Sequence, residues 1–161
     1  MSVYIIGDIH GCFDTFMALL KKLPKDAKIC LAGDLIDRGP KSKDVVQYVI
    51  DNNIDCVQGN HEDMMVVEPS YWSLNGGYET LESYSEEKED SHHLQLDKEL
   101  FKEHQLWMDK LPVYIEYPDV KNEDGRHLVV SHSILHNVWK HKDTDDEKLW
   151  ERFRREATWS R

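Results

Sequence analysis

The stretch that most constrains this chain is the octapeptide at residues 33–40, Gly-Asp-Leu-Ile-Asp-Arg-Gly-Pro. It follows an apolar run at residues 29–32, which predicts a buried β-strand. Two carboxylates and a guanidinium are thus presented just beyond the carboxyl end of a strand, where open α/β sheets bind ligands. Taken alone, the cluster fits a salt-bridged turn as well as it fits a ligand site.

Three more apolar runs, at residues 3–6, 54–57 and 127–130, end in a similar way. Each is followed by Asp, His or Asn side chains near glycine or serine: Asp8 and His10, Asn60 and His61, and His132. Carboxylates and imidazoles without a thiolate suit divalent Mn, Fe, Zn or Mg. The four strand ends together therefore predict a metal site.

The spacing of apolar residues predicts helices at residues 12–23 and 42–52, between the first three strands. This alternation is typical of an α/β fold with a parallel sheet, and right-handed crossovers would bring the site loops to one edge. We also expect helices at 61–67, 97–111 and 145–157, a turn at 71–77, a solvated connection at 85–97, and a second, partly antiparallel sheet containing a hairpin of 112–117 and 127–130.

Length and charge restrict the class of protein. The 161 residues predict one domain, and the formal net charge of -11 argues against a nucleic-acid partner, because phosphate backbones require a basic face. A phosphate site would have to be locally positive. The three cysteines form no disulfide framework, and no apolar span or export signal precedes the first strand. We therefore expect a cytoplasmic protein with no membrane partner.

Three motifs carry a family resemblance: Asp8-x-His10-Gly11, Gly33-Asp34-x-x-Asp37-Arg38-Gly39 and Gly59-Asn60-His61-Glu62. They resemble the calcineurin-like metallophosphoesterases, in particular their phosphoprotein phosphatase branch. Residues 74–77 and 159–161 are similar to phosphatases of the phage lambda type and their bacterial relatives. The resemblance implies a layered β-sheet sandwich flanked by helices, formed by a single domain at residues 1–161.

The resemblance also implies two divalent metal ions, manganese most readily, with iron, zinc or magnesium as alternatives. Asp8 and His10 would hold the first ion, Asp34 would bridge both, and Asn60 and His132 would hold the second. In the resembled family, a hydroxide between the two ions attacks the phosphoryl group directly.

The remaining site residues are also implied by the resemblance. His61 would be the general acid, oriented by Asp37, while Arg38, Asn60 and Arg161 would bind the phosphoryl group. A carboxylate beside an imidazole fits that role because it fixes the tautomer and raises the pKa. The alternative is a buried ion pair between His61 and Asp37 that only ties two loops together.

The chain departs from the family pattern in two places. The family has a further Gly-His segment that ligates the second metal, and more strands follow it; neither is found here. We therefore expect an incomplete C-terminal part of the sandwich, a weak second metal site, and self-association through an uncovered sheet edge. Gln58 stands where relatives commonly carry arginine.

The leading expectation is a metal-dependent phosphomonoesterase, namely a serine/threonine protein phosphatase acting on a phosphoprotein or a small phosphoester. A dinucleoside tetraphosphate hydrolase is the enzymatic alternative because it shares the three motifs. An inactive, truncated metal- or phosphate-binding module is the alternative from another class, and its basis is the absent Gly-His ligand.

Overall fold

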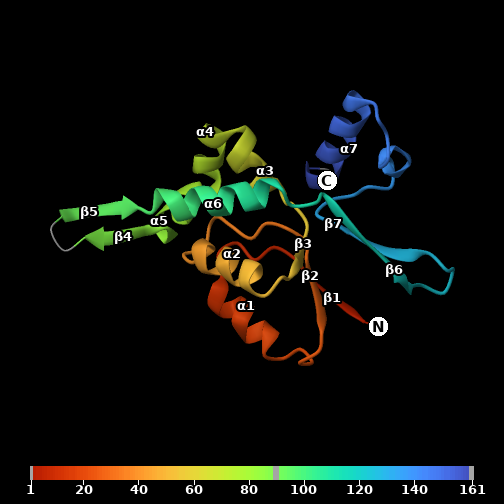
Figure 1. Ribbon diagram of the computed structural model, residues 1–161, viewed down its shortest axis with the longest axis horizontal. Coiled ribbons are helices and arrows are strands. Elements are labelled where there is room, and N and C mark those ends of the chain that lie inside the picture. Colours follow the sequence, from red (N-terminus) through yellow and green to blue (C-terminus); the bar gives the residue numbers. More distant parts are fainter. Residues whose placement is uncertain (1, 89–90, 160–161) are drawn as a thin grey trace.

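The computed structural model describes residues 2–88 and 91–159, and its first half forms a parallel sheet (Figure 1). Strands β1 (Val3–Ile6), β2 (Lys28–Leu31) and β3 (Asp55–Cys56) lie side by side in that order. Helices α1 (Phe13–Leu20) and α2 (Ser42–Asp51) form the crossovers. Because parallel strands end at the same edge of a sheet, the loops after them converge there. The predicted α/β arrangement is confirmed.

A chain of short helices follows β3. Helix α3 (Asn60–Val67) starts at the site edge, and α4 (Pro69–Trp72), η1 (Ser73–Gly77) and α5 (Tyr78–Ser83) continue from it. The turn expected at residues 71–77 is confined to Asn75 and Gly76, whose backbone is not helical, and the residues on either side of them are helical. The helical path is interrupted at Gly76, whose φ of 104° is accessible without strain only to glycine.

The next segment also differs from expectation. Residues 85–97 were expected to be a solvated connection, but strands β4 (Ser85–Lys88) and β5 (Ser91–Leu96) pair there in an antiparallel hairpin that projects from the body (Figure 1). Backbone hydrogen bonds pair such strands without requiring apolar side chains, so the polar composition was misleading. Helix α6 (Lys98–Asp109) then leads back, with Asp97 accepting a hydrogen bond from the Leu100 amide at 3.0 Å.

The last part of the chain confirms the predicted hairpin. Strands β6 (Tyr114–Lys121) and β7 (His127–Ser131) are antiparallel, and η2 (Trp139–His141) and α7 (Glu147–Trp159) follow.

No helix among residues 2–88 and 91–159 is long and apolar enough to cross a membrane. Ile5 on edge strand β1 is 49% exposed, and self-association through this edge stays a prediction.

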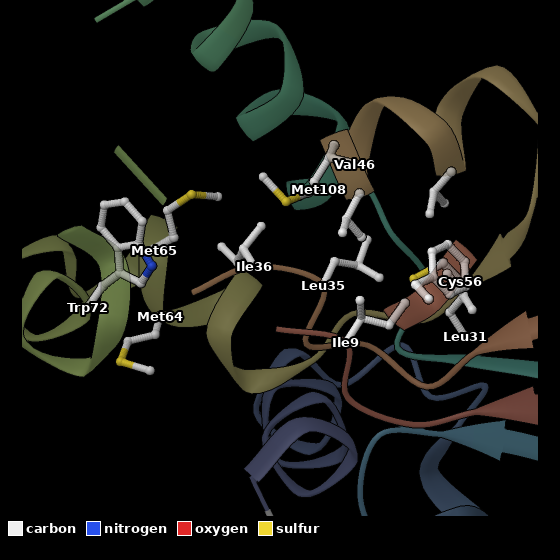
Figure 2. Close-up of a cluster of buried hydrophobic side chains, with 13 residues drawn as sticks. Ile9, Leu31, Leu35, Ile36, Val46, Cys56, Met64, Met65, Trp72 and Met108 are labelled. Atoms are coloured by element: carbon white, nitrogen blue, oxygen red, sulfur yellow. The ribbon is translucent and has the colours of Figure 1, made fainter. Parts of the chain in front are cut away.

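Two apolar clusters hold these elements. The larger one joins the parallel sheet to its helices and includes Leu31, Leu35, Ile36, Met64 and Met65 (Figure 2). Burial of such side chains is the main stabilising contribution to a fold of this kind. The second cluster packs α7 against the start of β6 and the segment after β7, through Val113, Leu135, Val138, Phe153 and Ala157. The loops that carry the polar side chains are therefore attached to elements that pack in these two apolar clusters.

Candidate active site

The loops at the sheet edge have an unusual backbone. Among the residues that the structure describes, five other than glycine have positive φ, and four of them are in these loops: His10 at 45°, Asp34 at 51°, Asp37 at 74° and Arg38 at 67°. Side chains other than glycine avoid this region, and such strain concentrates at functional sites. The clustering points to a site whose geometry is imposed by the fold.

Asp34 lies at the centre of the polar side chains that the loops bring together. Its Oδ2 is 3.7 Å from His10 Nε2 and 3.6 Å from His132 Nε2. Asp8 Oδ2 lies 4.0 Å from His10 Nε2, and Asn60 Oδ1 lies 2.9 Å from His132 Nε2. All five side chains that the sequence predicted as metal ligands are therefore in one cluster, although they come from four separate strand ends.

The hydrogen bonds behind the two imidazoles fix which nitrogen faces the cluster. His10 Nδ1 donates to the Ile36 carbonyl at 2.8 Å, and His132 Nδ1 donates to the Ala32 carbonyl at 2.7 Å. A neutral ring that donates from Nδ1 has its lone pair on Nε2. His132 Nε2 and Asn60 Oδ1 are then two acceptors facing each other, beside the Asp34 carboxylate. A divalent cation satisfies such a group, so the residues present fit a metal.

His61 and Asp37 form the most buried polar pair of the site. His61 Nδ1 lies 2.6 Å from Asp37 Oδ2, and Asp37 also accepts from Trp72 Nε1 at 2.8 Å and Thr80 Oγ1 at 2.7 Å. Burial by itself lowers the pKa of His61, but the hydrogen bond to Asp37 and the charge of Asp34 raise the pKa above its ordinary value. The pair can both orient the imidazole and join two loops.

Arg38 places its guanidinium over the cluster. Its two terminal nitrogens donate to His10 Nε2 at 2.7 Å and to His61 Nε2 at 3.1 Å. The side chain is solvent-exposed, so a ligand can reach it. A planar fork of donors at this position suits a phosphoryl group. Arg161, the second predicted phosphate ligand, lies outside the described residues, and its role stays a prediction.

Glu62 has a role at the site that the sequence reasoning missed. Its carboxylate is completely buried and accepts hydrogen bonds from three backbone amides: Asp34 at 2.9 Å, Leu35 at 2.8 Å and Gly59 at 2.9 Å. Burial and the charge of Asp34 raise its pKa to about 7, against the effect of the three amides. It joins the two loops that carry Asp34 and Asn60. Its position at N3 of α3 was the available signal, since a capping glutamate is common there.

Gln58, which stands where relatives commonly carry arginine, lies beside the guanidinium of Arg154 on α7. Arg154 Nη2 lies 3.3 Å from Gln58 Oε1 and 2.6 Å from Asp63 Oδ1. Trp159 Nε1 donates to the other oxygen of Asp63 at 2.8 Å. Asp63 is therefore the contact through which the end of α7 docks against α3, close to the metal-ligand loop.

The model of the family described as calcineurin-like phosphoesterases matches residues 1–159. This chain belongs to the calcineurin-like phosphoesterase family. The fold agrees: a solved metallophosphoesterase from Sphaerobacter thermophilus has a TM-score of 0.52 at 22% identity, over 74% of this chain and 44% of that one. A structure provisionally assigned as a diadenosine tetraphosphatase has a TM-score of 0.53 at 22% identity, over 83% and 50%.

Curated relatives have a higher sequence identity to this chain than these two solved structures do. A protein from Buchnera aphidicola subsp. Baizongia pistaciae named bis(5'-nucleosyl)-tetraphosphatase, symmetrical, is 32% identical over 149 residues, which are 86% of this chain and 46% of that protein. A protein of the same name from Salmonella paratyphi A is 45% identical over 67 residues, 38% of this chain and 24% of that one. The chain thus spans less than half of the length of these relatives.

Proposed function

We propose that this calcineurin-like phosphoesterase chain hydrolyses the phosphate chain of dinucleoside tetraphosphates with the help of divalent metal ions. The similarity to the Buchnera symmetrical tetraphosphatase over 86% of the chain carries the choice of substrate. It favours the alternative over the serine/threonine protein phosphatase that was the leading expectation from the sequence. Symmetrical cleavage of such a substrate yields two nucleoside diphosphates.

The metal ions would be held by the converging acceptors Asp8, His10, Asp34, Asn60 and His132, with Asp34 shared between the two imidazoles. When bound, divalent metals supply positive charge to the phosphoryl group and a nucleophilic hydroxide near neutral pH. Among the described side chains, those that converge with His132 are Asp8, Asp34 and Asn60. Asp8 is expected to hold the first ion and Asp34 is shared, so Asn60 and His132 are the described side chains left to the second ion alone, which supports the prediction that this site is weak.

Arg38 and His61 would act on the substrate itself. The exposed guanidinium of Arg38 would bind phosphoryl oxygens and neutralise the charge that spreads over them in the transition state. His61 faces the same space with Nε2, while its Nδ1 donates to Asp37. With Arg38 turned to the phosphates, the imidazolium form of His61 would deliver the Nε2 proton to the leaving oxygen and return to the neutral ring. Asp37 and Asp34 favour this imidazolium form by raising the pKa of His61. Asp37 would keep the ring in that orientation through its own bonds to Trp72 and Thr80.

Competing substrates test the proposal. The purified chain is titrated with manganese, and initial rates are measured on diadenosine tetraphosphate and on a phosphoserine peptide. We expect kcat/KM to be higher for diadenosine tetraphosphate, with ADP as the product. His61→Ala should lower turnover by about 10²–10⁴-fold. The loss should be greater on the peptide, because a serine alkoxide is a poorer leaving group than a diphosphate.

His136→Ala is the matched control, since His136 is exposed and lies outside the cluster. Its rates should equal those of the wild type. A higher kcat/KM on the phosphopeptide would return the assignment to a protein phosphatase. A folded chain that binds manganese and turns over neither substrate would contradict both, and would favour the binding module.

A further inference from the structure

Exposed apolar side chains concentrate on one segment of this chain, residues 67–78, which we call the aromatic segment. It holds the four most exposed large hydrophobic residues of the described part of the chain: Leu74 at 77%, Tyr78 at 60%, Val67 at 58% and Tyr71 at 52%. Such a concentration on a small protein marks a surface that meets a ligand or a partner.

The aromatic segment is attached directly to the candidate active site. Trp72, from the same segment, is buried and donates to Asp37 at 2.8 Å. The Gly76 carbonyl accepts from the Arg38 amide at 3.2 Å, and a Cβ added to Gly76 would lie 2.7 Å from that amide nitrogen. Leu74 and Tyr78 are each only two residues from this contact. The aromatic segment is therefore joined through Gly76 to the backbone of Arg38, the residue whose guanidinium covers the site.

The charge around the segment differs from the charge at Arg38. Residues 44–87 contain no lysine or arginine. Glu68 and Glu82 are exposed, and Glu79 is half-buried. A phosphate would be repelled here, whereas a neutral aromatic group could stack on tyrosine and donate from amino groups to carboxylates. A ligand that is anionic at one end and aromatic at the other matches the guanidinium and the aromatic segment together.

We propose that Tyr71 and Tyr78 bind a nucleobase of the substrate while Arg38 holds its phosphates. This inference rests on the proposed function and adds the part of the protein that distinguishes a nucleotide from a simple phosphoester. Leu74 and Val67 supply apolar surface beside the rings. An aromatic base is favoured over an apolar peptide segment because both exposed rings belong to one short segment whose Gly76 contacts the backbone of Arg38, the residue proposed to bind phosphates.

Binding of ADP and of inorganic pyrophosphate, measured by calorimetry on the manganese-loaded chain, tests this directly. The two ligands share a diphosphate and differ by the nucleoside. We expect ADP to bind about tenfold more tightly, as one stacked base provides. The double variant Tyr71→Ala/Tyr78→Ala should lose this advantage and keep its affinity for pyrophosphate. Tyr71→Phe/Tyr78→Phe keeps the rings and should retain it.

Leu106→Ala, an exposed leucine on α6, is the control and should change neither affinity. Both tyrosines are exposed, so the double variant should fold; if its circular dichroism shows otherwise, Tyr71→Ser and Tyr78→Ser are compared singly. The inference is overturned if wild-type ADP and pyrophosphate affinities are equal, or if the double alanine variant retains the difference.

Failure of the proposed function can be distinguished from failure of this inference, because the binding test requires no turnover. A tyrosine-dependent preference for ADP in a chain that does not cleave diadenosine tetraphosphate would support the nucleobase surface and refute the hydrolase. Cleavage without any dependence on the tyrosines would do the reverse. A molecular mass by light scattering that falls in the double variant, with ADP affinity unchanged, would assign the segment to a second copy and overturn the inference.

Discussion

The buried carboxylate of Glu62 offers the sharpest test of how the site is held together, through the substitution Glu62→Gln. Glutamine has nearly the same shape but only one acceptor oxygen. If that oxygen takes the place of Oε2, it keeps the bonds from the Asp34 and Gly59 amides and turns its NH2 group toward the Leu35 amide. The opposite orientation loses two bonds instead of one. At least one buried amide is therefore left facing a donor.

The expected magnitude follows from that single loss. A buried donor without a partner costs about 1–3 kcal/mol, so Glu62→Gln should lower the free energy of unfolding by about 2 kcal/mol. Glu62→Ala leaves all three amides without the carboxylate and should lower it by about 4 kcal/mol or more, which approaches the whole stability of a marginal domain. Because Glu62 orients the loops of two predicted metal ligands, we also expect manganese affinity to fall about 10–100-fold in Glu62→Gln.

Urea unfolding followed by tryptophan fluorescence, in EDTA at pH 8.5, measures the stability change with the carboxylate ionised. Calorimetry with manganese measures the second effect. Glu151→Gln on the exposed face of α7 is the matched control and should stay within about 0.5 kcal/mol of the wild type. A Glu62→Gln variant as stable as this control would refute the assignment of Glu62 as the acceptor that joins the two loops.

Two further predictions concern stability. Gly39→Ala should lower the free energy of unfolding by about 1–3 kcal/mol, because the new Cβ would collide with the His10 carbonyl, whereas Gly7→Ala meets open space and is the control in the same denaturation assay. Burial lowers the pKa of His104, whose Nδ1 faces the Tyr84 hydroxyl at 2.7 Å, so the unfolded chain binds more protons below its ordinary pKa of about 6.5. His104 should therefore destabilise the fold as the pH drops from 7 to 5, while the raised pKa values of Glu62 and His61 act in the opposite direction. The free energy of unfolding of the wild type should decrease relative to that of His104→Gln over this range, and a difference that does not change with pH would contradict this.

The sequence by itself determined the framework and the location of the site. Apolar runs followed by Asp, His or Asn at Asp8, Asp34 and Asn60 were enough to predict a parallel sheet with a polar cluster at one edge. This worked because strand and helix periodicity is local, and because parallel strands place their carboxyl ends together wherever they occur in the chain. His132 follows a strand of the separate antiparallel hairpin, so its place in the cluster was decided by tertiary packing. The structure brings these side chains together; their catalytic roles stay predictions.

Local pattern was less informative where backbone pairing or glycine geometry decides the outcome. The charged residues 85–97 were expected to be a solvated connection, yet β4 and β5 pair there through their backbones. The glycine- and aromatic-rich residues 71–77 were expected to be a turn, yet the chain stays largely helical there and breaks only around Gly76.

Only the tertiary structure decided which polar groups support the site. Asp37 is held by Trp72 and Thr80, which are 35 and 43 residues away, and Asp63 is reached by Arg154 from 91 residues away. A buried carboxylate must find hydrogen-bond donors, but any part of the chain that lies near in space can provide them. Sequence spacing carries no record of that choice, because it is made when the elements pack.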